Sequence, residues 1–484
     1  MPHVVSQLET AGITLRPLFV DLDGTLVKSD TLVDSLLALL RRRPALLLAL
    51  PAQLNRGKAA FKAFVTKSVA LDVDALPYNR KLLSFLQEQH KRGREIYLAT
   101  GADAALASRV SAHLGIFHGV IGSDGATNLT GDRKLDGLRS RFGMSQFDYI
   151  GNAYADLALL SRATVAMVAN PSLALRLKLR SRGIRPACEF NERRDFAASM
   201  LRALRPHQWA KNLLIFLPLL LSHSLALNRL LTGLLAFVCF SLTASATYIV
   251  NDLLDIETDR HHPQKRRRPF ASGDLSPLTG AGLAAALLLV AFLSARPLPV
   301  AFFGWLILYV VMTLSYSTWL KKIPLVDVLI LSGLYTLRLL AGSAATGSYI
   351  SHWLGGFSVF LFLSLAIAKR FAELQNLRAS GSVPKNGRGY LLADIDQLRS
   401  FGTSSAFASV VIFAIYISGS DVIKLYRQSA LLWLIMPLMI LWLCRVWLLA
   451  SRGMLHEDPV VFALTDRMSL LLGLAVAAIA FFAI

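Results

Sequence analysis

The sequence has few cysteines and few acids for its length. Cys188, Cys239 and Cys444 are its only thiols, and their wide spacing excludes a disulfide framework or a cysteine-rich metal site. It has 31 aspartates and glutamates but 51 lysines and arginines, so the formal net charge is +20. The first 19 residues also lack a charged segment followed by an apolar one. We therefore expect no cleaved signal peptide, and we expect the N-terminal half to stay in the cytoplasm.

The chain changes character near residue 200. The first half holds 27 of the basic residues and 18 of the acids, and it alternates short apolar runs with polar loops, as a soluble α/β domain does. Long apolar runs follow, which predict an all-α, polytopic membrane domain. We expect nine transmembrane helices, near 208–227, 229–250, 277–295, 298–319, 325–344, 352–369, 404–420, 428–450 and 467–484.

Charge in the second half is concentrated in alternate loops. The loops at 251–276, 320–323, 370–403 and 451–466 hold most of its basic residues, which predicts that they face the cytoplasm of a bacterial-type inner membrane. Nearly all of its acids lie on the same side. A simpler alternative is that charges merely avoid the hydrocarbon, although this does not explain why the acids choose these loops.

One such loop reads NDLLDIETDRHHPQKRRRPFASG at 251–273. If the preceding helix continues, Asp252, Asp255 and Asp259 line one face of it. Three carboxylates repel one another unless a cation neutralises them, and a set of oxygen ligands favours Mg²⁺. Asn251 would orient a carboxylate or bind phosphate, and the four cations at 265–268 would bind a polyphosphate. The alternative is a basic loop that binds lipid headgroups, which leaves the aspartates unexplained.

The pattern N-D-x-x-D-x-x-x-D and the R-P-x-x-x-G beginning at Arg268 resemble the UbiA superfamily of intramembrane prenyltransferases, over about 200–484. The segments RPHQWAKN, DRHHPQKRRRP, YSTWLKKIPLVDV, LYTLRLLAG and KRFAEL resemble the polyprenyl-phosphate phosphoribosyltransferases. That branch makes decaprenylphosphoryl-5-phosphoribose for arabinan synthesis. Where an aromatic prenyltransferase has its second aspartate motif, this chain reads AKRFAELQNLR, with Lys369 and Glu373 one helical turn apart.

The resemblance implies Mg²⁺-dependent transfer of 5-phosphoribose from phosphoribosyl pyrophosphate to a polyprenyl phosphate. Asp252, Asp255 and Asp259 would hold Mg²⁺ and the leaving diphosphate. Asp327 and Glu373 would bind ribose hydroxyls or a second metal ion. The implied phosphate-binding cations are Lys211, Lys265, Arg268, Lys321, Arg338 and Lys369. Arg338 lies inside a predicted span, where a cation usually has a function, and a salt bridge with Asp327 is its alternative role.

Four short segments of the first half carry polar residues that form a second motif set. Asp21 and Asp23 come directly after an apolar strand, Thr100 follows another, and NLTGDRKLDG and FDYIGNAYAD bring Lys134 and Asp156. In order they resemble the four motifs of the haloacid dehalogenase (HAD) superfamily, over about 15–190. The resemblance implies that Asp21 is the nucleophile, Asp23 the general acid/base, and Asp21 with Asp156 the Mg²⁺ site. Thr100 and Lys134 would bind the transferring phosphoryl group.

The fourth HAD motif departs from its usual form. Asn152 stands where an aspartate is common after the glycine, so a catalytically weakened regulatory domain is the alternative to an active phosphatase. The insertion at about 30–78 is apolar and helical and predicts a small cap, which its arginines and prolines interrupt too often for a membrane span.

The predicted organisation is therefore a HAD-like domain at 1–190, a linker at 191–204 and a UbiA-like domain at 205–484. The expected partners are phosphoribosyl pyrophosphate, a polyprenyl phosphate and the membrane, with no nucleic acid; a homo-oligomer is left open. Two other functions stay open as well. One is prenylation of an aromatic acceptor, and the other is transport of a lipid phosphate, which would predict midplane charges and an internal repeat.

Overall fold

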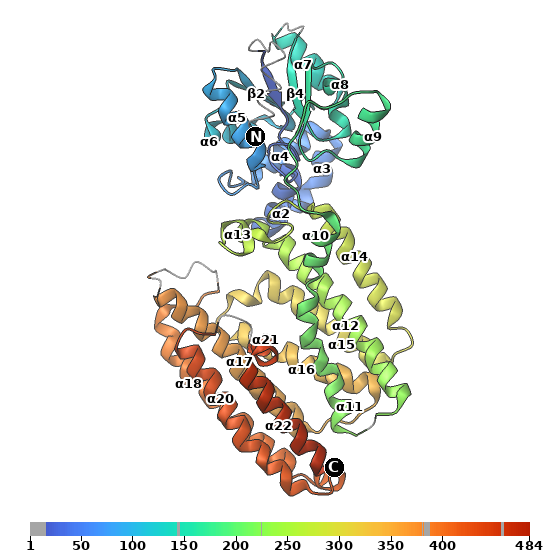
Figure 1. The fold of residues 1–484 in the computed structure, drawn as a ribbon, viewed down its shortest axis with the longest axis vertical. Coiled ribbons are helices and arrows are strands. Elements are labelled where there is room, and N and C mark those ends of the chain that lie inside the picture. Colours follow the sequence, from blue (N-terminus) through green and yellow to red (C-terminus); the bar gives the residue numbers. More distant parts are fainter. Residues whose placement is uncertain (1–15, 143–145, 224, 380, 382–387, 456–458) are drawn as a thin grey trace. The chain divides into compact units, whose positions relative to one another are not determined.

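The computed structural model describes residues 16–142, 146–223, 225–379, 381, 388–455 and 459–484 (Figure 1). The chain forms two compact units, and each is described by itself. The first comprises Met1–Ala203 and Asp252–Gly282, so it includes the segment with the aspartate motif. The second comprises Leu204–Asn251 and Leu283–Ile484.

A parallel sheet forms the centre of the first unit, as expected for an α/β domain. Among the described residues it has six strands in the order β3-β2-β1-β4-β5-β6. The chain winds outward from β1 to β3 and then returns to the other side of β1 for β4. Such a reversal opens a crevice at the carboxyl ends of β1 and β4. The strands are β1 Leu18–Val20, β2 Ile96–Asp103, β3 Gly119–Ser123, β4 Asp148–Gly151, β5 Val165–Val168 and β6 Cys188–Glu189.

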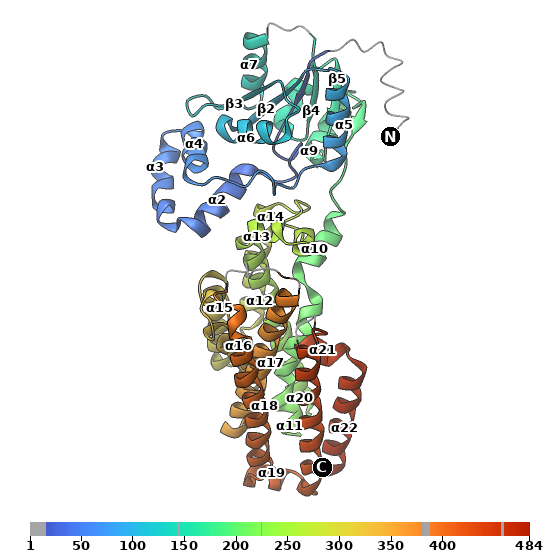
Figure 2. The ribbon, with the colours of Figure 1, turned by 90° about the vertical axis from the view of Figure 1, so that its left-hand side faces the viewer.

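Helices cover both faces of this sheet (Figure 2). Successive side chains of a strand point to opposite faces, so Leu18 and Val20 pack with α5 and α6 while Phe19 packs with α7, α8 and α9. The two apolar layers fix the strand ends, and with them the loops that follow. These helices are α5 Arg80–Lys91, α6 Ala104–Leu114, α7 Asp132–Phe142, α8 Leu157–Leu160 and α9 Leu173–Ser181.

The segment after β1 forms a helical insertion within the predicted cap range. Asp30 caps its first helix by accepting hydrogen bonds from the backbone N–H groups of Leu32 and Val33. Pro44 and Pro51 then divide the apolar run into short helices, as expected. The insertion comprises α2 Thr31–Arg42, the 3₁₀ helix η1 Pro44–Ala49, α3 Leu50–Asn55 and α4 Lys58–Ser68. At the other end of the domain, the predicted linker is largely helical, because α10 spans Phe196–Leu204.

The second unit is all-helical. Among the described residues seven helices are long and apolar enough to cross a membrane, so the chain is a multi-span membrane protein. Helices α18, α20 and α22 lie side by side (Figures 1 and 2). The seven candidate spans are α12 Leu227–Leu254, α14 Pro277–Ser294, α15 Val300–Thr318, α16 Val326–Thr346, α17 His352–Ala379, Leu392–Ile417 (η6 and α18) and Ser429–Ser451 (η7 and α20).

The expected count of nine spans is not confirmed. Helix α22, Arg467–Ala483, is apolar but shorter than the seven. The first predicted span, 208–227, is not one long α-helix: the 3₁₀ helix η3 (Pro206–Phe216) leads into the short α11 (Leu217–Leu221). Polar residues and two prolines within 206–218 explain the difference. The remaining elements are η5 Leu320–Lys322, α19 Ser420–Leu425 and α21 Pro459–Thr465.

Close packing of η3 against α16 depends on a glycine. A Cβ atom added to Gly342 would lie 2.1 Å from the backbone oxygen of Ile215. We expect Gly342→Ala to destabilise this unit by about 1–3 kcal/mol, because neither backbone can move far. Gly304→Ala is the matched control, since a Cβ there meets no atom within 4 Å. Thermal unfolding of the full-length protein in detergent should show a lower midpoint for Gly342→Ala alone; equal midpoints would refute the packing argument.

Candidate functional site

Three predicted residues converge at the carboxyl ends of β1 and β4. Asp21 directly follows β1, and Asp156 ends the 3₁₀ turn η2 (Tyr154–Asp156) just after β4. Lys134, on α7, lies between them: its Nζ is 2.7 Å from Asp21 Oδ1 and 3.3 Å from Asp156 Oδ1. All three side chains are buried. The crevice thus holds two carboxylates around one ammonium group.

Tyr149 completes this cluster and was missed by sequence reasoning. Its hydroxyl accepts a hydrogen bond from Lys134 Nζ at 2.8 Å and donates one to Asp156 Oδ1 at 2.7 Å. The tyrosine lies beside Ile150 in the buried strand β4, so the sequence carried no signal that its hydroxyl faces the site. Its contacts fix the rotamer of Asp156, whose other oxygen accepts the backbone N–H groups of Asn152 and Ala153.

The other predicted residues of this domain lie around the cluster. Asp23 Oδ1 accepts the backbone N–H of Thr31 at 2.8 Å. Thr100 is fully buried in β2, and its hydroxyl accepts the N–H of Ala102. The Asn152 side chain packs against Gly24, and its Oδ1 is buried without a hydrogen-bond partner among the described residues. The orphaned Asn152 oxygen and the carboxylates of Asp21 and Asp156 are all oxygen donors, which is the kind of ligand that Mg²⁺ takes.

Burial changes the protonation of these groups. It raises the pKa of Asp21 to about 6, with the Asp156 charge adding to the effect and Lys134 opposing it. It also raises the pKa of Asp23 to about 7, with further contributions from Asp30 and Asp21. Burial would lower the pKa of Lys134, but Asp21 and Asp156 outweigh it and raise that pKa. The cluster therefore keeps a charged lysine beside a carboxyl group that titrates near neutral pH.

A small pocket lined by Asp23 and by residues of the helical insertion adjoins the strand ends. Lys62, which no motif of the sequence singles out, reaches this pocket from α4. Its Nζ lies 2.6 Å from the carbonyl oxygen of Gly101 and 2.9 Å from Asn128 Oδ1. Asp30, Thr31 and Asp103 supply further polar lining. The pocket is thus suited to a polar group, next to the carboxylates at the strand ends.

In the aspartate motif the expected single helical face is only partly formed. α12 ends at Leu254 and α13 (Ile256–His261) begins after an irregular Asp255, although the N–H of Asp259 still bonds the Asp255 carbonyl. Arg268 Nη1 lies 3.0 Å from Asp252 Oδ1 and 2.6 Å from Asp259 Oδ2. Asp255 instead lies 4.0 Å from Arg41 Nη2. No three Asp, Glu, His or Cys side chains form a metal-binding group in the described ranges.

A second charged network lies in the membrane unit. Arg370 bonds Asp327 at 2.6 Å and Glu373 at 2.8 Å, and Glu373 also pairs with Arg388. Tyr390 donates a hydrogen bond to Asp327. The suggested salt bridge between Arg338 and Asp327 is therefore wrong, because Arg370 takes that place. The sequence led to the neighbouring Lys369 instead of Arg370. Lys369 and Arg370 are adjacent cations, and their order in the chain does not show which of them faces Asp327.

Arg338 has neutral partners. It is buried in α16, where it donates to Asn212 Oδ1 at 2.8 Å, to the Leu334 carbonyl and to the Tyr309 hydroxyl. Aromatic rings surround its guanidinium group, including that of Tyr335 at 5.5 Å. A buried cation with neutral partners is costly unless an anion joins it, so the site suits a negatively charged ligand.

The remaining predicted phosphate-binding residues lie at helix ends and on helix faces. Lys211 Nζ lies 5.7 Å from the centre of the Tyr335 ring. Lys265 begins the 3₁₀ turn η4 (Lys265–Arg267), and Lys321 lies in η5. Lys369 is on α17, and Asn251 is in the last turn of α12. The described contacts of the second unit thus place Lys211 and Arg338 around one aromatic ring.

Comparisons with known proteins define the class. The family model "UbiA prenyltransferase family" matches residues 213–483, and the chain belongs to this family. It is 37% identical to "Uncharacterized protein y4nM" of Sinorhizobium fredii, over 95% of this chain and 90% of that one. It is 32% identical to "Decaprenyl-phosphate phosphoribosyltransferase" of Mycobacterium tuberculosis, over 58% of this chain and 92% of that one. A UbiA homologue from Archaeoglobus fulgidus, solved with GPP and Mg²⁺, aligns with TM-score 0.45 and 18% identity over 58% of this chain and 99% of that one.

The pKa of Asp23 generates a prediction for stability. A carboxyl group whose pKa rises on folding binds protons more tightly in the folded state, so stability should fall as pH rises from about 4 towards 7. With metal ions removed by EDTA, Asp23→Asn should reduce this fall in the free energy of unfolding by about 2 kcal/mol. The figure follows from about 1.4 kcal/mol per pKa unit, reduced for solvent screening. Hydrogen–deuterium exchange of peptides from β1 and β4 between pH 5 and 7.5 measures it. Glu88→Gln, on exposed α5, should keep the wild-type slope; an unchanged slope in Asp23→Asn would contradict the assignment.

Proposed function

We propose that the UbiA-like part of the chain transfers 5-phosphoribose from phosphoribosyl pyrophosphate to a polyprenyl phosphate, such as decaprenyl phosphate. The observation that carries the proposal is the arginine-neutralised network of Asp327, Arg370 and Glu373. It stands where a second metal-binding aspartate motif would serve an aromatic prenyltransferase. The named phosphoribosyltransferase relatives support the same substrate class.

This reaction depends mainly on cationic groups that bind phosphate, and it does not require ligands for a second metal ion. A phosphate oxygen of the lipid attacks C1 of the ribose while the bond from C1 to the diphosphate oxygen breaks. Asp252 and Asp259 would hold Mg²⁺, with Asp255 as a third acid, and Arg268 would turn from the carboxylates to the diphosphate. Bound Mg²⁺ would neutralise the charge that develops on the leaving group. The Arg268 side chain is 26% exposed, which leaves it room to move.

Other residues would orient the substrates. Arg338 and Lys211 would bind a phosphate group, because a buried guanidinium among neutral partners gains most from an anion. Asn251, Lys265, Lys321 and Lys369 would contribute to the same recognition. Asp327 and Glu373, already paired with Arg370, are better suited to ribose hydroxyls than to a second metal ion. The active sites would face the cytoplasm, as the charge distribution predicts.

We further propose that the α/β domain is a HAD-like phosphatase that removes the 5-phosphate of the transferred group. Asp21 would attack phosphorus, and Asp23, with its pKa near neutrality, would protonate the departing ester oxygen. Water then hydrolyses the aspartyl phosphate, with Asp23 as the base. Thr100 and Lys134 would hold the phosphoryl group, and Asp21, Asp156 and Asn152 would hold Mg²⁺. Covalent tethering raises the effective concentration of the second site, to the order of millimolar.

Replacing the first aspartate of the motif tests the transferase. Asp252→Asn should lower turnover by at least about 100-fold, because the charge on the leaving diphosphate develops only in the transition state. Purified protein is incubated with radiolabelled phosphoribosyl pyrophosphate, short polyprenyl phosphate and Mg²⁺, and lipid-linked label is counted. Asp396→Asn, an exposed acid on α18, serves as control. Near-normal transfer by folded Asp252→Asn, or prenylation of a hydroxybenzoate instead, would overturn the proposal.

A second variant tests the phosphatase. Asp21→Asn removes the nucleophile and should leave transfer intact, so lipid extracts should accumulate the phosphorylated product at least about tenfold over wild type. Mass spectrometry of the two lipids gives the ratio. Asp124→Asn, an exposed turn residue of the same domain, should match wild type. If the ratio of the two lipids is the same in Asp21→Asn and in wild type, this domain does not remove the 5-phosphate of the lipid and the proposal is wrong.

A further inference from the structure

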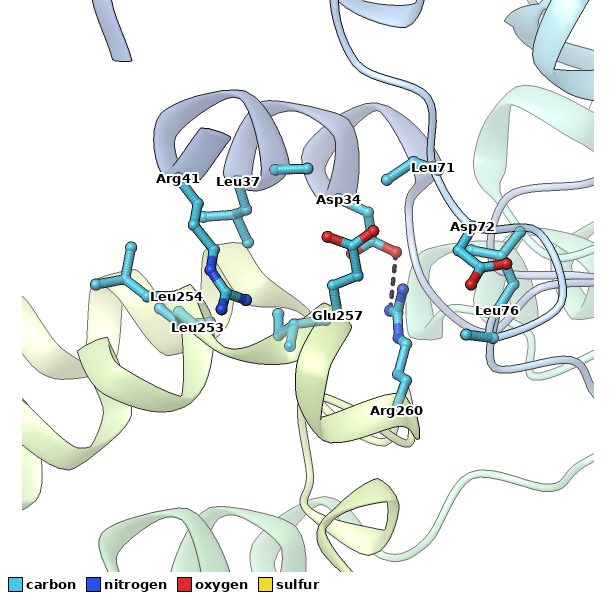
Figure 3. Close-up of a pocket in the computed structure, with 13 residues that line it drawn as sticks. Asp34, Leu37, Arg41, Leu71, Asp72, Leu76, Leu253, Leu254, Glu257 and Arg260 are labelled. Atoms are coloured by element: carbon cyan, nitrogen blue, oxygen red, sulfur yellow. Dashed lines mark ion pairs between the residues drawn. The ribbon is translucent and has the colours of Figure 1, made fainter. Parts of the chain in front are cut away.

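The helical insertion of the α/β domain lies directly against the aspartate motif of the transferase. Figure 3 shows α2 above α13, with Asp34 and Arg260 pointing toward one another. Both elements belong to the first compact unit. Leu37 and Leu71 face Leu253 and Leu254 across a small pocket between these segments.

One buried ion pair joins the two segments. Arg260 Nη2 lies 2.8 Å from Asp34 Oδ2, and the two side chains are 6% and 2% exposed. Ser29 Oγ donates to the same carboxylate oxygen at 2.7 Å and accepts from Arg260 Nη2 at 3.2 Å. Arg260 Nε also donates to the carbonyl oxygen of Ala271, beyond the basic run. A single guanidinium group thus links α2, α13 and the returning loop.

Weaker contacts surround this pair. Arg42 binds Glu257, and Arg41 donates to the hydroxyl of Thr258. His261 Nε2 lies 3.1 Å from Asp72. Residues 257, 258, 260 and 261 of the motif helix therefore contact the insertion and the loop that follows it. Asp252 and Asp259 contact Arg268 instead.

We infer that Asp34 and Arg260 are positioning residues that hold the aspartate motif of the transferase in its working shape. Arg260 directly follows Asp259, so a fixed Arg260 side chain restricts the backbone that carries that carboxylate. Removing one member of a buried pair leaves an uncompensated charge, which α13 relieves only by moving. Outer partners of metal ligands commonly change metal affinity or activity about 10–100-fold when lost. The α/β domain would then serve transfer independently of any hydrolysis at Asp21.

The experiment compares Asp34→Asn, Arg260→Gln and the double variant in full-length protein. Each single change should raise the Mg²⁺ concentration for half-maximal transfer by about tenfold, with a smaller change in rate at saturating Mg²⁺. The double variant should be no worse than either single one, because both remove the same interaction. Without added metal, hydrogen–deuterium exchange should also be faster than in wild type in peptides covering 255–262.

Asp148→Asn is the matched control. Asp148 forms a buried ion pair with Arg94 in the same domain, away from the motif. This variant should keep the wild-type Mg²⁺ requirement and the wild-type exchange of 255–262. If Asp34→Asn and Arg260→Gln behave like Asp148→Asn, or if their effects multiply in the double variant, the inference is wrong.

The inference rests on the proposed role of the motif in transfer, and the two fail differently. If Asp252→Asn retains normal transfer, the proposed function fails whatever the ion pair does. If Asp252→Asn abolishes transfer while Asp34→Asn leaves the Mg²⁺ requirement and the exchange unchanged, only the positioning role fails.

Discussion

A cation held between two carboxylates recurs among the described residues of this protein, and its polar sites depend on it. Lys134 lies between Asp21 and Asp156, Arg268 between Asp252 and Asp259, and Arg370 between Asp327 and Glu373. Two carboxylates brought together without a cation would repel each other and take up protons. Each cation therefore reduces the repulsion between its two acids and lets them lie close together.

The three clusters differ in how easily their cation could move. Lys134 and Arg370 are almost fully buried and have several fixed partners, whereas Arg268 is partly exposed on a loop between two helices. A buried and well-bonded cation acts as part of the framework, because moving it would leave its acids unpaired. Moving Arg268 costs less, because its partly exposed side chain can be solvated by water. Asp252 and Asp259 are therefore the carboxylates best able to exchange their cation for a metal ion.

The sequence predicted the architecture better than it predicted the contacts. Apolar strands followed by acids placed Asp21 correctly at a strand end, because parallel strands present their carboxyl ends at one edge of the sheet. Long apolar runs likewise predicted most of the membrane helices. The segment 208–227 does not form one long α-helix, and its hydropathy did not reveal that prolines and polar residues would shorten its helices. Tyr149 was missed because nothing in the sequence of β4 shows that its hydroxyl faces the site. Arg370 was missed because its partner Asp327 lies on another helix and the sequence does not show which of the adjacent Lys369 and Arg370 faces it.

The division into units also departs from the order of the chain. A boundary near residue 204 separates the two textures of the sequence, but the aspartate segment 252–282 belongs to the same compact unit as the α/β domain. Hydropathy could not show this, because Asp34 and Arg260 are more than 200 residues apart and neither belongs to a motif that pairs them. Their burial as a pair makes the α/β domain part of the environment of the transferase motif. The contacts run from Ser29, in the loop after β1, to the side chains of Asp34 and Arg260, and Arg260 directly follows Asp259 in the chain.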